Sequence, residues 1–215
     1  MRPITLDRYQ FLEKPNRRIE QIYFMDAGIA SVVAVQPGED RVEVGLIGCE
    51  GASGTAVMLG GTASPHETYI QAAGEGRQIA VGDFQAAMRA SKSLNALLLR
   101  YVQAFMVQTA HTAISNARAT LDRRLARWIL MAHDRVAGDS LPLTHEFLAL
   151  MLGVRRAGVT ETVHALASRG MIDAGRGQIV VRDRKALEKC AGKSYGVPEA
   201  EYRRLIGTFP YDGGG

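Results

Sequence analysis

The sequence has few cysteines and no long apolar run, and each absence excludes a class of protein. Cys49 and Cys190 are its two cysteines, too few for a disulfide framework and without the spacing of metal ligands. Mean hydropathy is -0.05, and no apolar run approaches the ~20 residues of a membrane-spanning helix. The N-terminal segment is polar and charged, unlike a secretory signal. We therefore expect a cytoplasmic protein with no membrane partner.

Groupings of catalytic residues are also missing from the sequence. It shows no paired carboxylates and no arrangement of a nucleophile with a base. Glycines cluster at Gly51–Gly54 and at Gly60 and Gly61, but neither cluster has the strand–loop–helix context of a nucleotide-binding motif. We therefore expect no enzymatic activity, and no cofactor is predicted.

The positive charge of the chain is concentrated in its second half. The formal net charge is +4 at pH 7. Residues 1–119 hold 11 Lys and Arg against 11 Asp and Glu, whereas residues 120–215 hold 15 against 11. A basic segment of this kind is typical of a nucleic-acid-binding domain.

Residues 1–90 are predicted to form a β-roll, because short β-prone segments alternate there with turn signals. Turns are predicted at Asp26–Gly28, Pro37–Asp40 and Gly74–Gly76. The strands between them are predicted near Ile22–Phe24, Ile29–Val35, Val42–Leu46, Glu67–Gln71 and Gln78–Val81. Short strands with regular turns favour a small barrel or jelly roll.

A short helix and a long helix follow the predicted roll. Asp83 is predicted to cap the short helix and Ser93 the long one. Along the long helix, apolar residues recur at steps of four and three residues, at Leu94, Leu98, Tyr101 and Phe105. Because the helix-turn-helix described below usually acts as a dimer on two DNA half-sites, residues 91–119 are predicted to be a dimerisation helix. The alternative is an ordinary core helix.

Residues 120–215 carry the pattern of a winged helix-turn-helix. Ala149, Gly153 and Val159 stand where the motif requires a small residue, a turn glycine and a buried apolar residue. The predicted helices are Leu121–Ala137, His145–Leu152 with Thr144 as its cap, and Arg155–Arg169. A hairpin of Met171–Ala174 and Gln178–Val181 with a Gly175–Gly177 turn is the predicted wing. The predicted fold class is α+β.

The second helix of the motif is predicted to enter the major groove of double-stranded DNA through its N-terminal residues. The Arg156 guanidinium fits guanine O6 and N7, and the Glu161 carboxylate can accept from cytosine N4. Thr144 at a helix N-terminus and Arg176 at the wing tip suit phosphate oxygens. The predicted DNA contacts are Thr144, Arg155, Arg156, Ala157, Thr160, Glu161 and Arg176.

The succession of β-roll, long helix and winged helix resembles the Crp/Fnr superfamily of bacterial transcription regulators over nearly the whole chain. The similarity is strongest in LDRRLARWILMAHDRV, LPLTHEFLALMLGVRRAGVTETVHALASRGMI and GRGQIVVRDRKALE. The resemblance implies a cyclic-nucleotide-binding-like roll, a homodimer paired through the long helix, operator binding and contact with RNA polymerase. It also implies that Arg156 is the main guanine-reading residue and that Glu161 is a second base contact. Ala157 replaces a frequent glutamate of the family, so we expect an operator that differs from the best-known consensus.

The ligand that the roll would sense is less well indicated. By the resemblance, Glu50 would hold a ribose hydroxyl, and the phosphate would lie near His66 and Thr68. No Lys or Arg occurs between Arg41 and Arg77 to neutralise that phosphate, which argues against a cyclic nucleotide. An iron–sulfur cluster requires four cysteines and is also argued against.

Two other sensor chemistries stay open at this point. His66 or His111 could ligate haem, although a lone histidine is more often structural. Cys49 could act as a thiol sensor, or it could be a small apolar residue.

The function that the sequence favours is a homodimeric, DNA-binding transcription regulator that recognises a pseudo-palindromic operator. The alternative is a protein that binds a cyclic nucleotide or another small ligand and uses its helix-turn-helix for protein contacts. The arginines at the start of the second helix and at the wing tip favour DNA.

Overall fold

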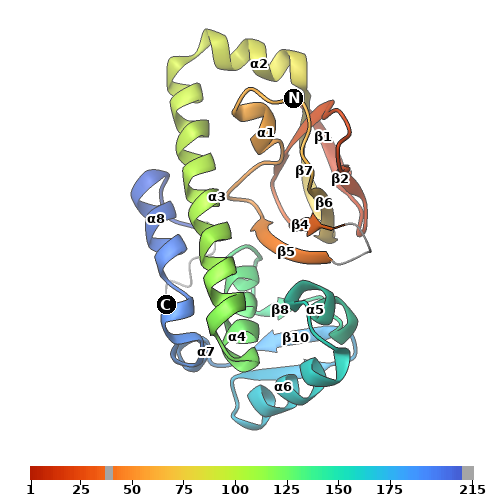
Figure 1. The fold of residues 1–215 in the computed structure, drawn as a ribbon, viewed down its shortest axis with the longest axis vertical. Helices are drawn as coiled ribbons and strands as arrows, with labels where there is room; N and C mark the ends of the chain where they lie inside the picture. The colour runs from red at the N-terminus through yellow and green to blue at the C-terminus, as the bar shows by residue number, and fades with distance from the viewer. Residues whose placement is uncertain (37–40, 210–215) are drawn as a thin grey trace.

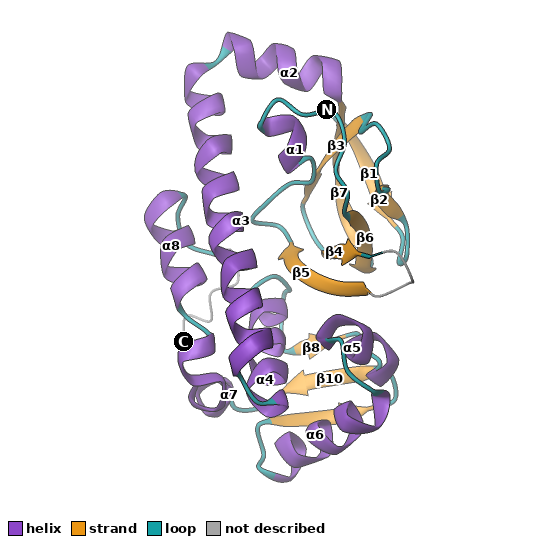
Figure 2. Ribbon diagram, viewed as in Figure 1, coloured by secondary structure: helices purple, strands orange, loops and turns teal. Residues whose placement is uncertain are grey.

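The computed structural model describes residues 1–36 and 41–209, and it arranges the chain along one long helix, α3 (Lys92–Arg118). Figures 1 and 2 show the β-strands of the N-terminal part beside one half of α3 and the C-terminal domain at its other end. The helix α8 (Val197–Leu205) returns along α3 near the C-terminus. This architecture has the predicted α+β class, with a roll, a long helix and a winged helix-turn-helix.

The roll consists of two antiparallel sheets, with the strand orders β1-β7-β3 and β2-β6-β4-β5. Its strands are β1 (Arg2–Leu6), β2 (Phe11–Glu13), β3 (Gln21–Met25), β4 (Ile29–Val35), β5 (Arg41–Ile47), β6 (Glu67–Ala72) and β7 (Gly74–Ala80). The predicted turn at Asp26–Gly28 connects β3 and β4, and the predicted turn at Pro37–Asp40 lies outside the described residues.

The predicted turn at Gly74–Gly76 is wrong, because these residues are the first part of β7. Gly74 pairs with Leu6 of β1, and Gly76 pairs with both Ile4 and Met25. A Cβ atom on Gly74 would lie 2.2 Å from the Ala27 carbonyl oxygen. The glycines therefore let two backbones approach closely within a sheet. Close backbone approach is, besides a turn, a second reason for glycine in a β-segment.

Alternating side chains of the two sheets fill the interior of the roll with apolar atoms. This core contains Leu6, Met25, Ala30, Val32, Ile47 and Ile70. The turn between β3 and β4 depends on Gly28, whose φ is 89°. A Cβ atom there would lie 2.6 Å from the Ala72 carbonyl oxygen, so another residue would be strained and would clash.

Three helices follow or interrupt the roll: α1 (Thr55–Met58), α2 (Val81–Ala90) and α3. The predicted caps of α2 and α3 are wrong. Asp83 lies inside the first turn of α2, and the residue that caps α3 is Ser91, whose hydroxyl accepts from the Leu94 amide at 3.2 Å. The cap comes two residues earlier than predicted because Ser91 and Ser93 are equivalent in sequence, and only backbone geometry separates them.

The predicted apolar stripe of α3 faces the protein's own core. Leu98 and Tyr101 are 5 % and 7 % exposed and pack with Ile22, Ala52 and other residues of the roll. The core-helix alternative therefore describes these residues, and pairing of α3 with a second copy stays a prediction.

The C-terminal domain places its helices around a small three-stranded sheet, β8-β10-β9. Its elements are α4 (Leu121–His133), β8 (Ser140–Leu141), α5 (His145–Leu152), α6 (Arg156–Ser168), β9 (Ile172–Gly175), β10 (Gln178–Val181), α7 (Arg184–Ala191), a short 3-10 helix (Gly192–Ser194) and α8. The helix α4 ends four residues before the prediction. Its C-terminal Asp134 carboxylate is buried and binds Arg184 at 2.6 Å, beyond the regular helix.

Two buried polar contacts join the roll to the C-terminal domain. The Trp128 indole of α4 donates to the Glu43 carboxylate of β5 at 2.5 Å. The Arg135 guanidinium donates to Glu50 at 2.8 Å, and both side chains are 3 % exposed. One apolar cluster also contains residues of both parts, so the two parts pack as one body in this structure.

The end of the chain contributes to the core of the roll and α3. Tyr202 and Phe209 are 7 % and 5 % exposed, and they share an apolar cluster with Tyr101 of α3. The predicted domain boundaries at residues 90 and 120 stay predictions. Among the described residues, no helix is long and apolar enough to cross a membrane.

Candidate nucleic-acid interface

The helices α5 and α6 form a helix-turn-helix through a glycine turn. Gly153 has a φ of 60° and ends α5, where its Cβ-free backbone adopts a left-handed conformation. The Val154 amide donates to the Ala149 carbonyl at 3.0 Å, which closes the turn. Val159 is fully buried and Ala149 is 9 % exposed, as the sequence predicts for the crossing of the two helices.

The wing and the N-terminus of α5 lie together. The Thr144 hydroxyl caps α5 by accepting from the Phe147 amide at 3.2 Å, as predicted. A Cβ atom on Gly177 of the wing turn would lie 3.9 Å from Thr144 Cγ2. The exposed Arg176 therefore lies beside a capped helix N-terminus, and both can bind phosphates of the same DNA strand.

The N-terminal turn of α6 presents exposed side chains. Arg155 is the N-cap residue, Arg156 begins the helix, and both arginines are exposed, as are Ala157 and Glu161. The Arg156 guanidinium lies 3.2 Å from the Glu146 carboxylate of α5, with side-chain exposures of 66 % and 74 %. An ion pair exposed to this extent contributes little free energy, so the guanidinium is available to a ligand.

The Thr160 hydroxyl is engaged with both helices of the motif. The hydroxyl donates to the Arg156 carbonyl at 3.1 Å, and it lies 3.0 Å from His145 Nδ1. His145 thus connects the start of α5 to α6, a contact that sequence reasoning missed because the pattern along α6 alone does not reveal it. A direct contact of Thr160 with DNA stays a prediction.

Comparison with known proteins agrees with this geometry. Residues 123–190 match the family model of the Crp-like helix-turn-helix domain. The structure resembles that of FixK2 from Bradyrhizobium japonicum, with 14 % sequence identity, a TM-score of 0.73 and coverage of 88 % of this chain and 96 % of that one. The chain has the Crp/Fnr fold.

Two further solved structures share this fold. A CRP-family transcriptional regulator from Thermus thermophilus is 21 % identical, with a TM-score of 0.66 and coverage of 89 % of this chain and 97 % of that one. The c-di-GMP responsive global regulator CLP from Xanthomonas campestris is 16 % identical, with a TM-score of 0.62 and coverage of 83 % and 92 %. No curated protein sequence matches the chain significantly. The predicted resemblance to Crp/Fnr regulators is therefore confirmed for the fold and for the helix-turn-helix domain.

Within this Crp/Fnr fold, the three predicted ligand-binding residues do not converge. Glu50 is committed to Arg135 and also accepts from the Gly48 amide at 3.0 Å. Thr68 is buried in β6, where it pairs with Glu13 and Val32, and the His66 amide donates to the Ser64 hydroxyl. The cation near His66 and Thr68 is Arg41, and it is paired with Glu67.

Arg135 and Arg41 pair with carboxylates of the roll, and sequence reasoning missed both pairs. Arg135 neutralises Glu50 from a helix end 85 residues away in the chain. Arg41 pairs with Glu67, which the sequence left without a partner. Both pairs join segments that are distant in sequence, so no local signal could have found them.

The geometry gives little support to metal or thiol chemistry in this chain. In the part of the chain that the structure describes, no group of three or more His, Cys, Asp or Glu side chains could hold a metal ion. Cys49 is partly buried, and its Sγ lies 3.8 Å from the Arg135 carbonyl oxygen. Burial and the neighbouring Glu50 raise the pKa of the thiol to about 11, so the reactive thiolate is disfavoured at neutral pH.

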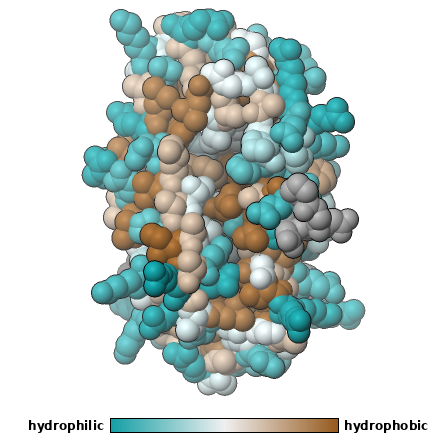
Figure 3. All heavy atoms as spheres, viewed as in Figure 1, coloured by the Kyte–Doolittle hydropathy of each residue, from teal (hydrophilic) through white to brown (hydrophobic). Residues whose placement is uncertain are grey.

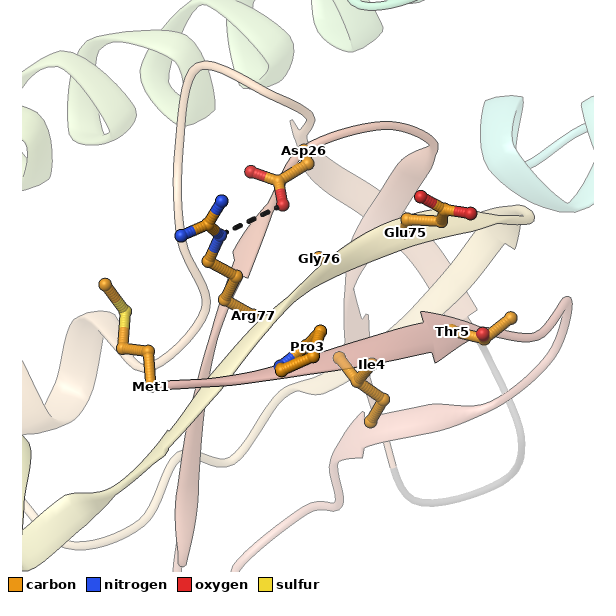
Figure 4. A pocket seen from close by; sticks show the side chains of 8 residues that line it. All are labelled: Met1, Pro3, Ile4, Thr5, Asp26, Glu75, Gly76 and Arg77. Carbon is orange, nitrogen blue, oxygen red and sulfur yellow. Dashed lines mark hydrogen bonds and ion pairs between the residues drawn. The ribbon is translucent and has the colours of Figure 1, made fainter.

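A surface hollow of about 630 Å³ lies on the outer side of the β1-β7-β3 sheet (Figure 4). Its polar edge is the ion pair between Arg77 and Asp26, at 3.4 Å, and both side chains are more than half exposed. Because exposed charges are already hydrated, the hollow offers little binding free energy to a small molecule.

Proposed function

We propose that this chain is a homodimeric transcription regulator that binds double-stranded DNA. The observation that carries the proposal is the pair of exposed arginines, Arg155 and Arg156, at the N-terminus of the second helix of the helix-turn-helix. In this motif that end of the helix enters the major groove. Regulation of transcription also requires a contact with RNA polymerase, or its exclusion from the promoter.

The predicted contacts divide into two kinds. Arg156 and Glu161 are assigned to base edges, with Arg156 on guanine and Glu161 on cytosine or on a neighbouring arginine. Ala157 lies beside them as a small apolar contact. Thr144 and Arg176 are assigned to phosphates, which position the domain without reading sequence, and Arg155 at the helix start is assigned to either a base or a phosphate. The second kind makes binding depend on salt, because each neutralised phosphate releases counterions.

A continuous exposed face of α3 supports the homodimer. We call this face the α3 seam; its residues recur at steps of three and four and are Ala96, Leu99, Gln103, Met106, Ala110, Ala113 and Ala117. Leu99 and Met106 are 43 % and 57 % exposed in the single chain. Figure 3 shows apolar atoms in a column over α3 on the face turned to the viewer. Such a repeat is the pattern of a helix pair, in which alanines allow close approach.

Selection from a pool of random duplexes of about three helical turns tests the function. The full chain is incubated with the pool at low salt, bound duplexes are recovered, and the enriched sequences are compared. We expect a motif with twofold symmetry whose half-sites are centred about one DNA turn, ~34 Å, apart. Enrichment of no motif, or of one half-site from a monomeric protein, would contradict the proposal.

Met106→Glu is expected to dissociate the dimer. In a symmetric helix pair, the two introduced carboxylates would face each other near the seam, where like charges cost several kcal/mol and raise the dissociation constant about 100-fold or more. Analytical ultracentrifugation over a concentration series measures the change. Ser93→Glu, at an exposed position of α3 outside the seam, serves as the control and is expected to leave the dimer intact.

A further inference from the structure

His145 and Thr160 connect the two helices of the helix-turn-helix at the end where α6 is assigned to DNA. His145 is the first residue of α5, Thr160 lies one turn into α6, and both are half-buried. The ring Nδ1 of His145 lies 3.0 Å from Thr160 Oγ1. The same Oγ1 lies 3.1 Å from the Arg156 carbonyl oxygen. The Thr160 side chain is therefore held by both helices.

The two contacts assign the hydroxyl proton and the rotamer of Thr160. A carbonyl oxygen can only accept, so the hydroxyl donates to Arg156. The hydroxyl oxygen then accepts from the His145 ring, whose hydrogen is therefore assigned to Nδ1. A threonine within a helix populates two rotamers, because its hydroxyl can bond to the carbonyl of the preceding turn. The bond from His145 requires Oγ1 to be turned toward α5, so it selects one of the two.

The selected rotamer determines which part of Thr160 is left for a ligand. Threonine carries a hydroxyl and a methyl group on the same Cβ, at different staggered positions. With Oγ1 turned toward α5, the Cγ2 methyl takes another of these positions. Arg156 and His164, four residues before and after Thr160, are exposed, so Thr160 lies along the face that α6 offers to DNA. Thr160 therefore offers this face an apolar methyl group and not a hydroxyl.

A methyl group on this face selects among the bases of DNA. Of the four bases, thymine alone carries a methyl group in the major groove, on C5, and a threonine methyl is one of its apolar partners. A hydroxyl would be less selective, because it can bond to the donors and acceptors of several bases. Thr160 and Arg156 are four residues apart, about 6 Å along the helix axis. Base pairs follow one another at about 3.4 Å, so the thymine is expected within about two base pairs of the guanine assigned to Arg156.

We propose that Thr160 recognises the 5-methyl group of one thymine in each operator half-site, and that His145 is the positioning residue that turns the Thr160 methyl toward it. His145 acts through Thr160 and is assigned no contact of its own with DNA. This recognition of thymine rests on the proposed DNA-binding function. It adds to that function the base that a further side chain of α6 reads.

Deoxyuridine in place of thymine tests the contact, because it removes the 5-methyl group and keeps every hydrogen-bonding group of the base. Each thymine of the operator recovered by selection is replaced in turn, in both half-sites together, and affinity for the full chain is measured by fluorescence anisotropy. At one thymine close to the guanine assigned to Arg156, the affinity is expected to fall about tenfold, from about three- to fourfold for each methyl group. Unchanged affinity at every position, or an operator with no thymine in this region, would overturn the proposal.

Two conservative substitutions in α6 assign the methyl contact to a residue. Thr160→Ser removes the methyl group, keeps the hydroxyl, and is expected to bind the thymine and deoxyuridine operators equally well. Thr162→Ser is the matched control, because Thr162 is a half-buried threonine of the same helix whose hydroxyl donates to the Gly158 carbonyl at 2.7 Å. This control is expected to keep the preference for thymine. A preference that survives Thr160→Ser would assign the thymine methyl to another residue, such as Ala157, and would overturn the proposal.

Substitutions of His145 test its positioning role. His145→Ala removes the donor to Thr160 and is expected to lower the thymine preference from about tenfold to about threefold or less, because Thr160 can then adopt its second rotamer. His145→Asn keeps an N–H donor near the position of Nδ1 and is expected to restore the preference. If His145→Ala lost stability but kept the full preference for thymine, His145 would have a structural role only, and the positioning role would be overturned.

Failure of this proposal differs from failure of the proposed function. An operator that the unsubstituted chain binds equally well with thymine or deoxyuridine at every position contradicts the recognition of thymine alone and leaves the DNA-binding function standing. A chain that binds no duplex at all contradicts the DNA-binding function, and the recognition of thymine with it.

Discussion

Arg156→Ala is expected to lower affinity for the selected operator about 5- to 150-fold, the equivalent of about 1–3 kcal/mol for one bidentate guanine contact. Binding to a scrambled duplex is expected to change little, because Arg156 is assigned to a base and not to a phosphate. The substitution removes an exposed pair with Glu146 and no buried contact, so the fold is expected to keep its stability. Fluorescence anisotropy with both duplexes measures the difference.

Two matched variants make the Arg156 result specific. Arg176→Ala removes a cation at the wing tip and is expected to weaken binding to both duplexes alike. The slope of log affinity against log salt concentration is expected to become smaller in magnitude by about one. Glu146→Gln removes the partner of Arg156 and is expected to keep operator affinity. If Arg156→Ala lost affinity for operator and scrambled DNA to the same extent, this arginine would have to be assigned to a phosphate and not to a base.

The helix-turn-helix was predictable because its signals are local. Thr144 caps α5 and Gly153 ends it, and both act through hydrogen bonds or dihedral angles within a few residues of the chain. The bounds predicted for α5, His145–Leu152, agree with the structure, and those of α6 differ by one residue at each end. Local interactions of this kind can be predicted from consecutive residues.

The roll was harder to predict because its pairing is not local. The strands β1 and β2 were missed, since each is short and finds its partner, β7 or β6, more than 50 residues later. The sequence predicts a turn at Gly74 and Gly76, whereas both allow close contact between neighbouring backbones. A glycine in a β-prone segment can mark a turn or a close backbone contact, and only the position of the partner strand distinguishes the two.

The direction of α3 relative to the core was also not predictable from its sequence. Leu98 and Tyr101 belong to one apolar stripe of α3, and Leu99 and Met106 belong to another on a neighbouring face. The first pair is buried in the chain's own core and the second is exposed. A helix that is apolar on two faces has two surfaces to cover, and the sequence does not say which of them lies against the roll.

Glu43 is a buried acidic residue that joins the two parts of the chain. Its carboxylate is 5 % exposed and lies between the Trp128 indole and the Ser31 hydroxyl, which is at 2.7 Å. The same hydroxyl lies 2.7 Å from Gln71 Oε1. One hydroxyl proton cannot serve both acceptors. Turning the Gln71 amide, whose Nε2 is buried without a partner, would let Nε2 donate to Ser31; a protonated Glu43 that donates to Ser31 is the other solution, and it is the interpretation that we favour. Burial raises the pKa of Glu43 to about 7, which agrees with this interpretation.

Glu43→Gln is therefore expected to make the protein more stable at pH 8 and to flatten its pH dependence. The pKa of Glu43 is about 7 in the folded chain, against 4.5 for an ordinary glutamate carboxyl, so its stabilising contribution is complete below pH 4.5 and is lost as pH rises through 7. The shift corresponds to about 3 kcal/mol lost by pH 8. Glutamine can donate to Ser31 and accept from Trp128 as the protonated acid does, without the charge.

Urea unfolding at several pH values between 5 and 8 measures this effect as the difference between Glu43→Gln and the unsubstituted chain. Burial also raises the pKa of Glu13 and Glu199, so the stability of Glu43→Gln still depends on pH. Only the difference between the two proteins therefore isolates the contribution of Glu43. The positive charges of Arg127 and Arg135 lower the pKa of Glu43, and both arginines are present in both proteins. Glu75→Gln, at an exposed position of β7, is the control and is expected to follow the unsubstituted chain. Parallel pH profiles for Glu43→Gln and the unsubstituted chain would mean that Glu43 is ionised in the fold at pH 5, and the protonated network would then be wrong.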